Sequence, residues 1–186
     1  MDPDDYLAYR NRAYVYAYSL NDNEKALIDY NKAIELDSIG INFSHRGYFY
    51  NEIGEYNKAL LDYNKAVELD PDDMDYLFDR ALVYDHIEGN NKGISDLLRI
   101  IELDKDGSYR KENGSVYNNL AVYYGRIENY DKQLEYYNEE INLNPDDYLA
   151  YRNRARLYAF KFNDNEKALI CLLYTSPSPR DGLLSR

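Results

Sequence analysis

Few side chains in this sequence could carry out chemistry as a group. The chain has two histidines, His45 and His86, and a single cysteine, Cys171. A structural zinc site needs four such ligands at short spacings, and no second cysteine or third histidine completes a set. The sequence also lacks a glycine-rich phosphate loop, a nucleophile elbow and a candidate set of serine, histidine and aspartate. It therefore predicts no catalytic residue, no metal site and no cofactor site, and a protein that is not an enzyme.

Two acidic clusters, DPDDMD at 70–75 and LDKDGSY at 103–109, contain the oxygen ligands that calcium prefers. A helix–loop–helix calcium site also requires a glycine at the sixth loop position and a glutamate at the twelfth, and neither cluster has them. We expect both clusters to be solvated connections between helices.

An internal repeat determines which elements position the remaining residues. DDYLAYRNRA at 4–13 returns unchanged at 146–155, and NDNEKALI at 21–28 returns at 163–170. Between them, a small residue followed three positions later by tyrosine recurs at steps of 34, 34, 40 and 34 residues, at Ala13/Tyr16, Gly47/Tyr50, Ala81/Tyr84, Ala121/Tyr124 and Ala155/Tyr158. This period is typical of units that cannot bury their apolar face alone and must stack on one another.

Each unit contains two short helices, which we call helix A and helix B in chain order. Helix B is clearest in NKALLDYNKAVELDP at 57–71, where apolar and small residues recur at three- and four-residue steps. Small residues let two helix backbones approach closely, and tyrosine rings fill the space between helix pairs. Pro71 and Pro145 follow helix B and cannot continue it. The sequence thus predicts an all-α fold of stacked helical hairpins.

These features resemble the tetratricopeptide repeat (TPR) family. The second unit matches the family pattern most fully, at Phe43, Gly47, Tyr50, Gly54, Tyr56, Ala59, Tyr63, Ala66 and Pro71. The resemblance covers about residues 2–170 and implies a right-handed α–α superhelix of about five repeats, the last truncated. One departure recurs: the family's usual leucine is replaced in four units, by Arg12, Arg46, Arg80 and Arg154, and only Leu120 conforms.

The repeat predicts units at approximately 2–37, 38–73, 74–104, 105–147 and 148–170. The 40-residue step predicts a longer polar connection within 105–114. Residues 171–181, CLLYTSPSPRD, break the pattern and resemble a translated adapter from transposon-based sequencing libraries. We therefore expect 171–186 to be an artefactual tail, disordered after residue 175. Because neither end carries a polar cap, we also expect self-association through the uncapped end.

Charge and hydropathy restrict the partners. The formal net charge of −12 would repel a phosphate backbone, which argues against nucleic acid and against the RNA-binding relatives of this repeat. No apolar run is long enough to cross a bilayer, and the first residues lack the features of a secretory signal, so we expect a cytoplasmic protein with no membrane partner.

The resemblance implies that helix A side chains not used in stacking line a concave groove that holds a peptide. Carried over by position, the groove residues are Arg10, Tyr14, Tyr48, Phe78, Leu82, Asn118, Val122, Arg126, Arg152 and Arg156. Arginine can pair with carboxylates through two hydrogen bonds, and tyrosine offers a rigid contact surface. The predicted function is a non-enzymatic scaffold that binds a peptide or protein. The alternative is a partner- or substrate-targeting domain of a larger enzyme, truncated here.

Overall fold

The computed structural model describes residues 4–87, 89–113 and 116–173. The all-α prediction is confirmed, since every regular element in these ranges is a helix. The helices are α1 (Tyr6–Tyr18), α2 (Asn23–Leu36), α3 (Gly40–Glu52), α4 (Tyr56–Leu69), α5 (Met74–His86), α6 (Asn90–Leu103), α7 (Ser108–Asn113), α8 (Val116–Arg126), α9 (Tyr130–Leu143), α10 (Tyr148–Phe160) and α11 (Asn165–Leu173). They form two compact units, Met1–Leu103 (unit 1) and Asp104–Arg186 (unit 2). The limits of the individual repeats stay predictions.

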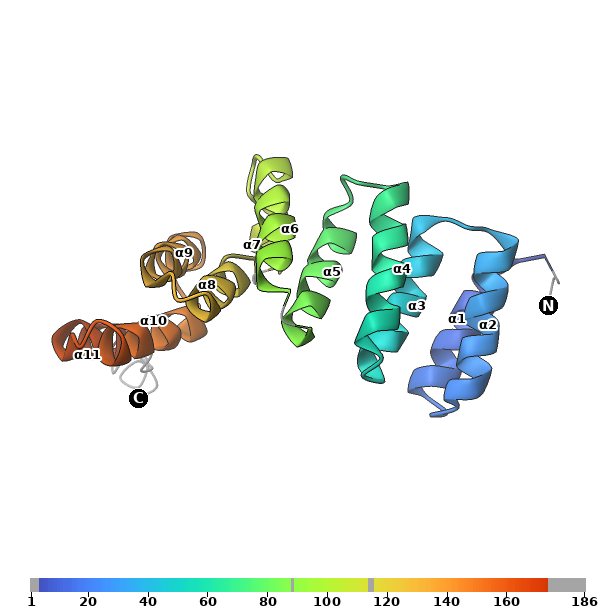
Figure 1. The fold of residues 1–186 in the computed structure, drawn as a ribbon, viewed down its shortest axis with the longest axis horizontal. Helices are drawn as coiled ribbons and strands as arrows, with labels where there is room; N and C mark the ends of the chain where they lie inside the picture. Colours follow the sequence, from blue (N-terminus) through green and yellow to red (C-terminus); the bar gives the residue numbers. More distant parts are fainter. Residues whose placement is uncertain (1–3, 88, 114–115, 174–186) are drawn as a thin grey trace, which may run out of the picture. The chain divides into compact units, whose positions relative to one another are not determined.

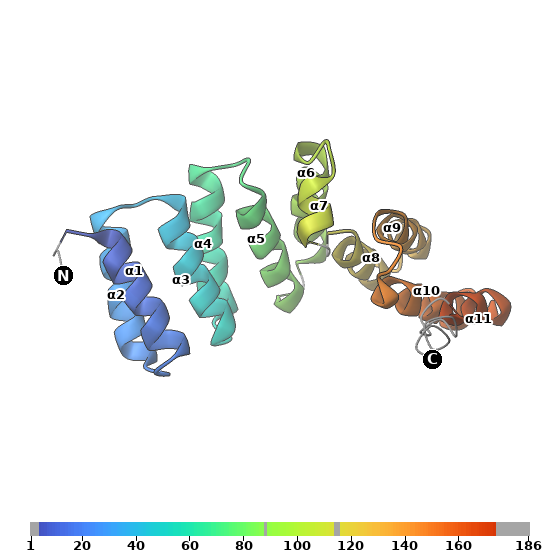
Figure 2. The ribbon, with the colours of Figure 1, turned by 180° about the vertical axis from the view of Figure 1, so that it is seen from behind.

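Unit 1 consists of three helical hairpins, α1–α2, α3–α4 and α5–α6 (Figures 1 and 2). Each hairpin packs on the next through its second helix, α2 on α3 and α4 on α5. The first helices also contact one another, α1 with α3 and α3 with α5. Ala13 and Ala81 are fully buried where helix A crosses helix B, so the small residues of the repeat lie where the backbones approach closely.

Unit 2 contains the hairpins α8–α9 and α10–α11, with α9 packed on α10. Ile141 of α9 packs with Ala150 and Tyr151 of α10. The short helix α7 contacts α8 and occupies the longer connection predicted within 105–114. Unit 2 therefore uses the same packing as unit 1, with one additional helix.

Aspartates at the linkers fix where several helices begin. The Asp5 carboxylate accepts hydrogen bonds from the backbone N–H groups of Leu7 and Ala8, at 2.9 and 3.2 Å. Asp73 and Asp147 cap α5 and α10 in the same way. Side-chain oxygens at this position satisfy N–H groups that have no partner within the helix. The cluster at 70–75 is thus the end of one helix and the cap of the next.

A bidentate ion pair joins the two helices of each hairpin in unit 1. In the second repeat, Arg46 Nε and Nη2 of α3 donate to the two carboxylate oxygens of Asp62 in α4, at 2.8 and 2.6 Å. The pairs Arg12–Asp29 and Arg80–Asp96 have the same geometry. The aspartate is buried in all three pairs. The arginines that depart from the family pattern are therefore structural residues.

The same guanidinium groups also link neighbouring repeats. Arg46 Nη1 donates to Asn31 of the preceding helix B at 2.6 Å, and Arg80 Nη1 donates to Asn64 at 3.1 Å. In unit 2, Arg154 Nη1 donates to Asn138 at 2.7 Å. A planar guanidinium group can serve two partners at once because its five N–H groups point in fixed directions.

Unit 2 does not keep the carboxylate partner. In the fourth repeat Leu120 replaces the arginine, and Tyr136 stands where the aspartate would be, stacked against Tyr124 with ring centroids 5.4 Å apart. In the fifth repeat Arg154 Nε donates to the sulfur of Cys171 at 3.3 Å. Cys171 is buried with Ala155 and Ala168, in the position that Asp29 occupies in the first repeat.

The segment that resembles an adapter begins within α11, which continues through Cys171 to Leu173. Leu169 and Leu173 of this helix are exposed at 64% and 74%. Residues 174–186, including the part expected to be disordered, lie outside the described residues.

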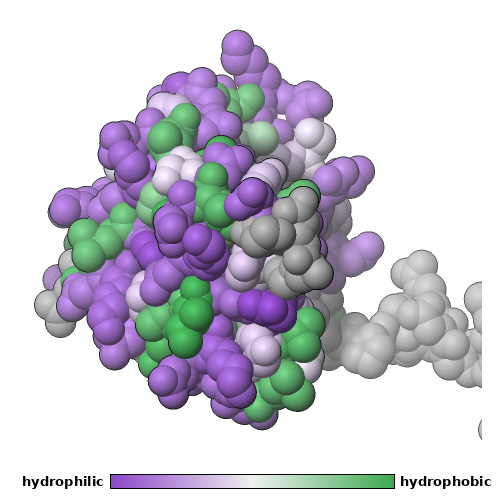
Figure 3. Space-filling view, turned by 90° about the vertical axis from the view of Figure 1, so that its right-hand side faces the viewer, coloured by the Kyte–Doolittle hydropathy of each residue, from purple (hydrophilic) through white to green (hydrophobic). Residues whose placement is uncertain are grey.

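At the other end of the chain, the face of unit 1 formed by α1 and α2 is mostly hydrophilic, with separate hydrophobic areas (Figure 3). Leu20 and Ile28 are among its exposed hydrophobic residues.

Glu140 of α9 is a buried carboxyl at a position where the other repeats carry Ala33, Ala66 or Ile100. Its side chain is 1% exposed, and Asn144 Nδ2 donates to Glu140 Oε1 at 2.7 Å. Burial raises the pKa of Glu140, because the charged form loses more hydration than the hydrogen bonds from the Asn144 amide and the Asn118 backbone N–H replace.

We expect the Arg46–Asp62 pair to be replaceable as a pair but not singly. Arg46→Leu leaves the buried Asp62 carboxylate without its partner and should cost about 3 kcal/mol of unfolding free energy. Arg46→Leu combined with Asp62→Tyr recreates the combination found at Leu120 and Tyr136 and should recover most of that loss. Urea denaturation of the four proteins in this cycle measures the coupling; purely additive losses would contradict it.

We expect Glu140→Gln to stabilise the protein at pH 7 more than at pH 4. Because the pKa of Glu140 is raised in the folded state, the unfolded chain ionises first as the pH rises, and folding stability falls across that interval. Glutamine removes the cost of ionisation. The measurement is the melting temperature of parent and variant at both pH values, with the exposed neighbour Glu139→Gln as control. An equal shift at both pH values would contradict the assignment.

Candidate functional site

The helix A face of unit 1 carries a row of tyrosines. Among the predicted groove residues, Tyr14 of α1 and Tyr48 of α3 are exposed at 51% and 43%. Tyr18, which was not predicted, lies between them: its ring centroid is 4.7 Å from that of Tyr14 and 5.9 Å from that of Tyr48. Phe78 and Leu82, on α5, are half-buried. The structure therefore joins two of the predicted residues into one aromatic surface.

Arg10 is less available to a partner than its position suggests. Its guanidinium Nη1 donates to Asn42 Oδ1 at 3.4 Å, and the side chain is half-buried. Burial and the nearby Arg10 charge lower the pKa of His45, so its imidazole is neutral at pH 7. Arg10 thus belongs in part to the packing between α1 and α3.

A half-buried acid on α5 was also missed from the sequence. Asp79 of α5 is hydrogen-bonded to the Tyr63 hydroxyl. Burial, followed by the nearby Asp75 charge, raises the pKa of Asp79 to about 6. The predicted groove residues lie four residues apart along helix A. They therefore include Phe78 but not its sequence neighbour Asp79.

The helix A residues of unit 2 lie around a cleft between α8, α9 and α10. Its volume is about 360 Å³. The cleft is lined by Val122, Gly125, Arg126, Tyr130, Gln133, Tyr137, Asn153, Arg156, Leu157, Phe160 and Lys161. It brings together three of the predicted residues: Val122, Arg126 and Arg156. The other eight lining residues were not predicted.

The two remaining predicted residues of unit 2 lie outside the lining. Asn118 of α8 accepts a hydrogen bond from Asn153 Nδ2 of α10 at 3.2 Å, so it helps to join the two helices. Arg152 is exposed on α10 but does not line the cleft. Of the five predicted groove residues of unit 2, three therefore line the cleft and two do not.

A glycine and a glutamine shape one wall of the cleft. Gln133 of α9 stands where other repeats have Ala26, Ala59 or Ala168. A Cβ atom at Gly125 would lie 2.5 Å from Gln133 Nε2, so the Gln133 side chain in its present position depends on the glycine at 125. Gln133 Nε2 also donates to the Tyr137 hydroxyl at 3.4 Å. The glycine at position 125 therefore leaves room for the larger side chain at position 133.

One cation of the cleft, Lys161, lies over an aromatic ring. Lys161 Nζ lies 4.7 Å from the centroid of the Tyr130 ring, and a hydrogen bond with Tyr130 raises the pKa of Lys161. Burial raises the pKa of the Tyr137 hydroxyl, which therefore stays neutral at pH 7. This arrangement can bind a negatively charged or aromatic group.

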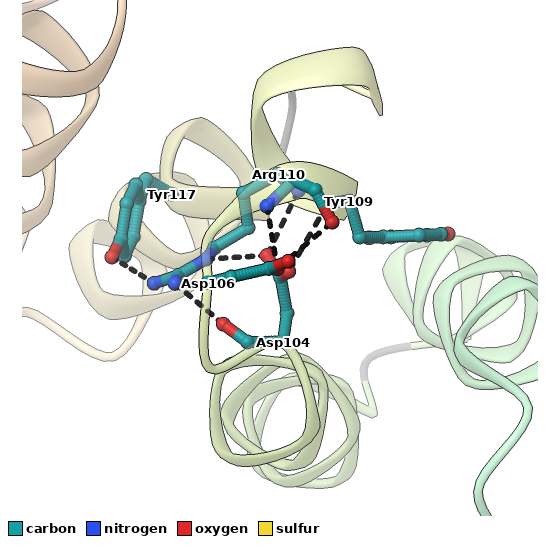
Figure 4. Close-up of polar contacts among 6 residues, drawn as sticks. Asp104, Asp106, Tyr109, Arg110 and Tyr117 are labelled. Atoms are coloured by element: carbon teal, nitrogen blue, oxygen red, sulfur yellow. Dashed lines mark hydrogen bonds and ion pairs between the residues drawn. The ribbon is translucent and has the colours of Figure 1, made fainter.

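The acidic cluster at 103–109 forms an intramolecular clasp (Figure 4). Asp104 accepts hydrogen bonds from the backbone N–H groups of Tyr109 and Arg110 and from Arg110 Nε, at 3.1, 3.0 and 2.8 Å. Arg110 also donates to the Tyr117 hydroxyl of α8. Burial acts to raise the pKa of Asp104, but the hydrogen bonds outweigh it and hold the pKa below its usual value. The cluster thus positions α7.

Comparisons with known proteins agree with this architecture. The family model described as "Tetratricopeptide repeat" matches residues 7–39 and 114–147, and the one described as "TPR repeat" matches 47–85. Together they cover more than half of the chain. A search of curated proteins finds no match. None of these comparisons supports the interpretation of residues 171–181 as an adapter.

Solved structures with the same fold include several TPR proteins. YrrB matches with a TM-score of 0.73 at 24% identity, over 94% of this chain and 86% of YrrB. MamA from Desulfovibrio magneticus matches with a TM-score of 0.80 at 15% identity, over 94% of each chain. A TPR protein from Parabacteroides merdae matches with a TM-score of 0.75 at 24% identity, over 95% of this chain and 68% of its own. At these identities the similarity concerns the fold. With the family models and the helical hairpins in agreement, the chain belongs to the tetratricopeptide repeat family.

Proposed function

We propose that this chain is a non-enzymatic scaffold that binds a peptide or protein partner on the helix A faces of its repeats. The observation that carries the proposal is that helix A side chains remain accessible after the hairpins have packed. Tyr14 and Tyr48 are about half exposed in unit 1, and Arg126 and Arg156 lie at an open cleft in unit 2. Tyrosine and arginine are enriched among residues that dominate binding energy.

A similar structure supports this proposal. YrrB is described as a TPR protein with an unusual peptide-binding site. Because YrrB and this chain share a fold at low identity, peptide binding enters here as part of the proposal. A preformed helical face can hold an extended peptide without a large rearrangement.

Other interpretations stay predictions. Among the residues that the structure describes, no three His, Cys, Asp or Glu side chains gather as a metal site, and no helix is long and apolar enough to span a membrane. A role as the targeting domain of a larger enzyme can be tested by the gene sequence beyond the codon for Ile170. Self-association through the exposed leucines of α11 can be tested by light scattering.

We expect Tyr14→Ala and Tyr48→Ala each to weaken peptide binding about tenfold, since an exposed tyrosine in a binding site contributes roughly 1–2 kcal/mol. The measurement is fluorescence anisotropy of the full chain with peptides selected from a random display library. Tyr148→Ala is the control, because Tyr148 is equally exposed but lies at the start of α10. Unchanged affinity in both variants, with helicity preserved by circular dichroism, would remove unit 1 from the proposed binding surface.

A further inference from the structure

The two units of the chain differ strongly in charge. Residues 1–103 contain 10 Lys and Arg against 21 Asp and Glu, a formal charge of −11. Residues 104–186 contain 12 against 13, a formal charge of −1. Within residues 148–163, which include α10, there are four cations and no carboxylate. The acidity of the whole chain therefore conceals a segment that is locally basic.

The cleft of unit 2 concentrates this basic character. Arg126, Arg156 and Lys161 line it, and none of its lining residues is Asp or Glu. Within the described part of the chain, Arg156 forms no ion pair, and Lys161 is held by the Tyr130 ring and hydroxyl. An arginine without a carboxylate partner can form two charge-assisted hydrogen bonds with an incoming carboxylate.

The cleft also has an apolar side. Phe160 of α10 is 79% exposed, although it is a large aromatic residue. Val122 of α8 is half-buried, and Leu157 is buried beneath the cleft. A ligand that satisfied only the cations would leave Phe160 in water. The lining therefore fits a ligand that combines negative charge with an apolar or aromatic group.

The internal duplication shows where the cleft segment differs from its copy in α1. Residues 6–20 and 148–162 are identical at the first eight positions, and they differ at five of the remaining seven. The five differences are Tyr14/Arg156, Val15/Leu157, Tyr18/Phe160, Ser19/Lys161 and Leu20/Phe162. Four of the five residues in the second copy line the cleft. Two of these four, Arg156 and Lys161, add a positive charge. The divergence between the copies is concentrated at the cleft.

We propose that the cleft between α8, α9 and α10 binds an acidic segment of a partner protein, with its carboxylates on Arg156 and Lys161 and an apolar side chain on Phe160. This inference rests on the proposed scaffold function and names the chemistry of the partner. A volume of about 360 Å³ accommodates a few residues of an extended chain and excludes a folded domain.

Charge favours a short acidic peptide over a nucleic acid. A phosphate backbone carries charge along its whole length, and the formal charge of −12 on this chain would oppose its approach. A peptide with two or three carboxylates confines its charge to the cleft, and its apolar side chain gains contact with Phe160. The partner is therefore a protein segment rich in Asp or Glu with an aromatic or aliphatic residue among them.

The test is a paired selection from a random peptide display library. One arm uses the parent chain, and the other uses the double variant Arg156→Tyr with Lys161→Ser. Both replacements are the residues that α1 already carries at the same positions, so the helix should fold. We expect peptides enriched on the parent and lost on the double variant to be acidic with an aromatic or aliphatic residue.

Fluorescence anisotropy then measures the affinity of a selected peptide. We expect the double variant to bind about tenfold or more weakly, since each charge-assisted hydrogen bond removed weakens binding by roughly that factor. The same peptide with Gln and Asn in place of Glu and Asp should lose binding to a similar extent. Lys167→Ser is the matched control, because it removes one charge from α11, where Lys167 is paired with Asp164 outside the cleft.

The outcomes separate this inference from the proposed function. If peptides are enriched equally on the parent and the double variant, the chain binds peptides but the cleft is not their acidic site. If no peptide is enriched on either protein, the scaffold function itself fails. Stronger binding of single-stranded RNA than of any selected peptide, at the same ionic strength, would overturn the assignment of a protein partner.

Discussion

The ion pair between a helix A arginine and a helix B aspartate is the interaction on which the packing of unit 1 depends. The aspartates Asp29, Asp62 and Asp96 are buried, and a buried carboxylate without a partner costs several kcal/mol. The bidentate geometry therefore fixes the rotation of helix A against helix B within each hairpin. Because Arg46 and Arg80 also donate to the preceding helix B, at Asn31 and Asn64, the same groups set the position of one hairpin on the next.

Loss of this ion pair in unit 2 has an electrostatic consequence. In the fourth repeat both charges are absent, since Leu120 and Tyr136 replace the pair, whereas in the fifth repeat Cys171 replaces only the carboxylate and Arg154 keeps its charge. Tyr136 stacks between Tyr117 and Tyr124, and Cys171 packs against Ala155 and Ala168, so both positions remain filled. Unit 2 keeps the hairpin packing by exchanging charge for aromatic and sulfur contacts, and its local potential becomes more positive.

The sequence predicts the helices better than the site because the two depend on different information. The helical hairpins can be predicted from three local features. These are the exact duplication, the recurring small residue followed by tyrosine, and the prolines in the linkers. The groove residues were chosen by position in helix A alone. Of these, Tyr14 and Tyr48 lie in the exposed tyrosine row, and Val122, Arg126 and Arg156 line the cleft. A cleft also needs walls from helix B and from the turn. Gln133, Phe160 and Lys161 were therefore missed. Their positions in the cleft depend on contacts between helices, such as Gln133 with Gly125 and Lys161 with the Tyr130 ring. The arginines at positions 12, 46 and 80 appeared to be departures until their partners were seen, because a pair separated by 16 or 17 residues has no local signature.

The duplicated helices α1 and α10 show how one scaffold can present two chemistries. Both keep the first half of the helix, which carries the arginine and the alanine used for packing, Arg12 and Ala13 in α1 and Arg154 and Ala155 in α10. The second half differs between the two helices. In α1 it carries Tyr14 and Tyr18, which belong to a neutral row of tyrosines. In α10 and the residue after it, Arg156, Phe160 and Lys161 line the cationic cleft. Four of the five differing positions are not buried in the second copy, and the fifth, Leu157, exchanges one aliphatic residue for another, so the substitutions alter mainly what the surface can recognise. Stacked hairpins allow packing and recognition to use different residues of one helix. Each repeat is held by its own ion pair or core contacts, so the residues on its exposed surface can differ from repeat to repeat.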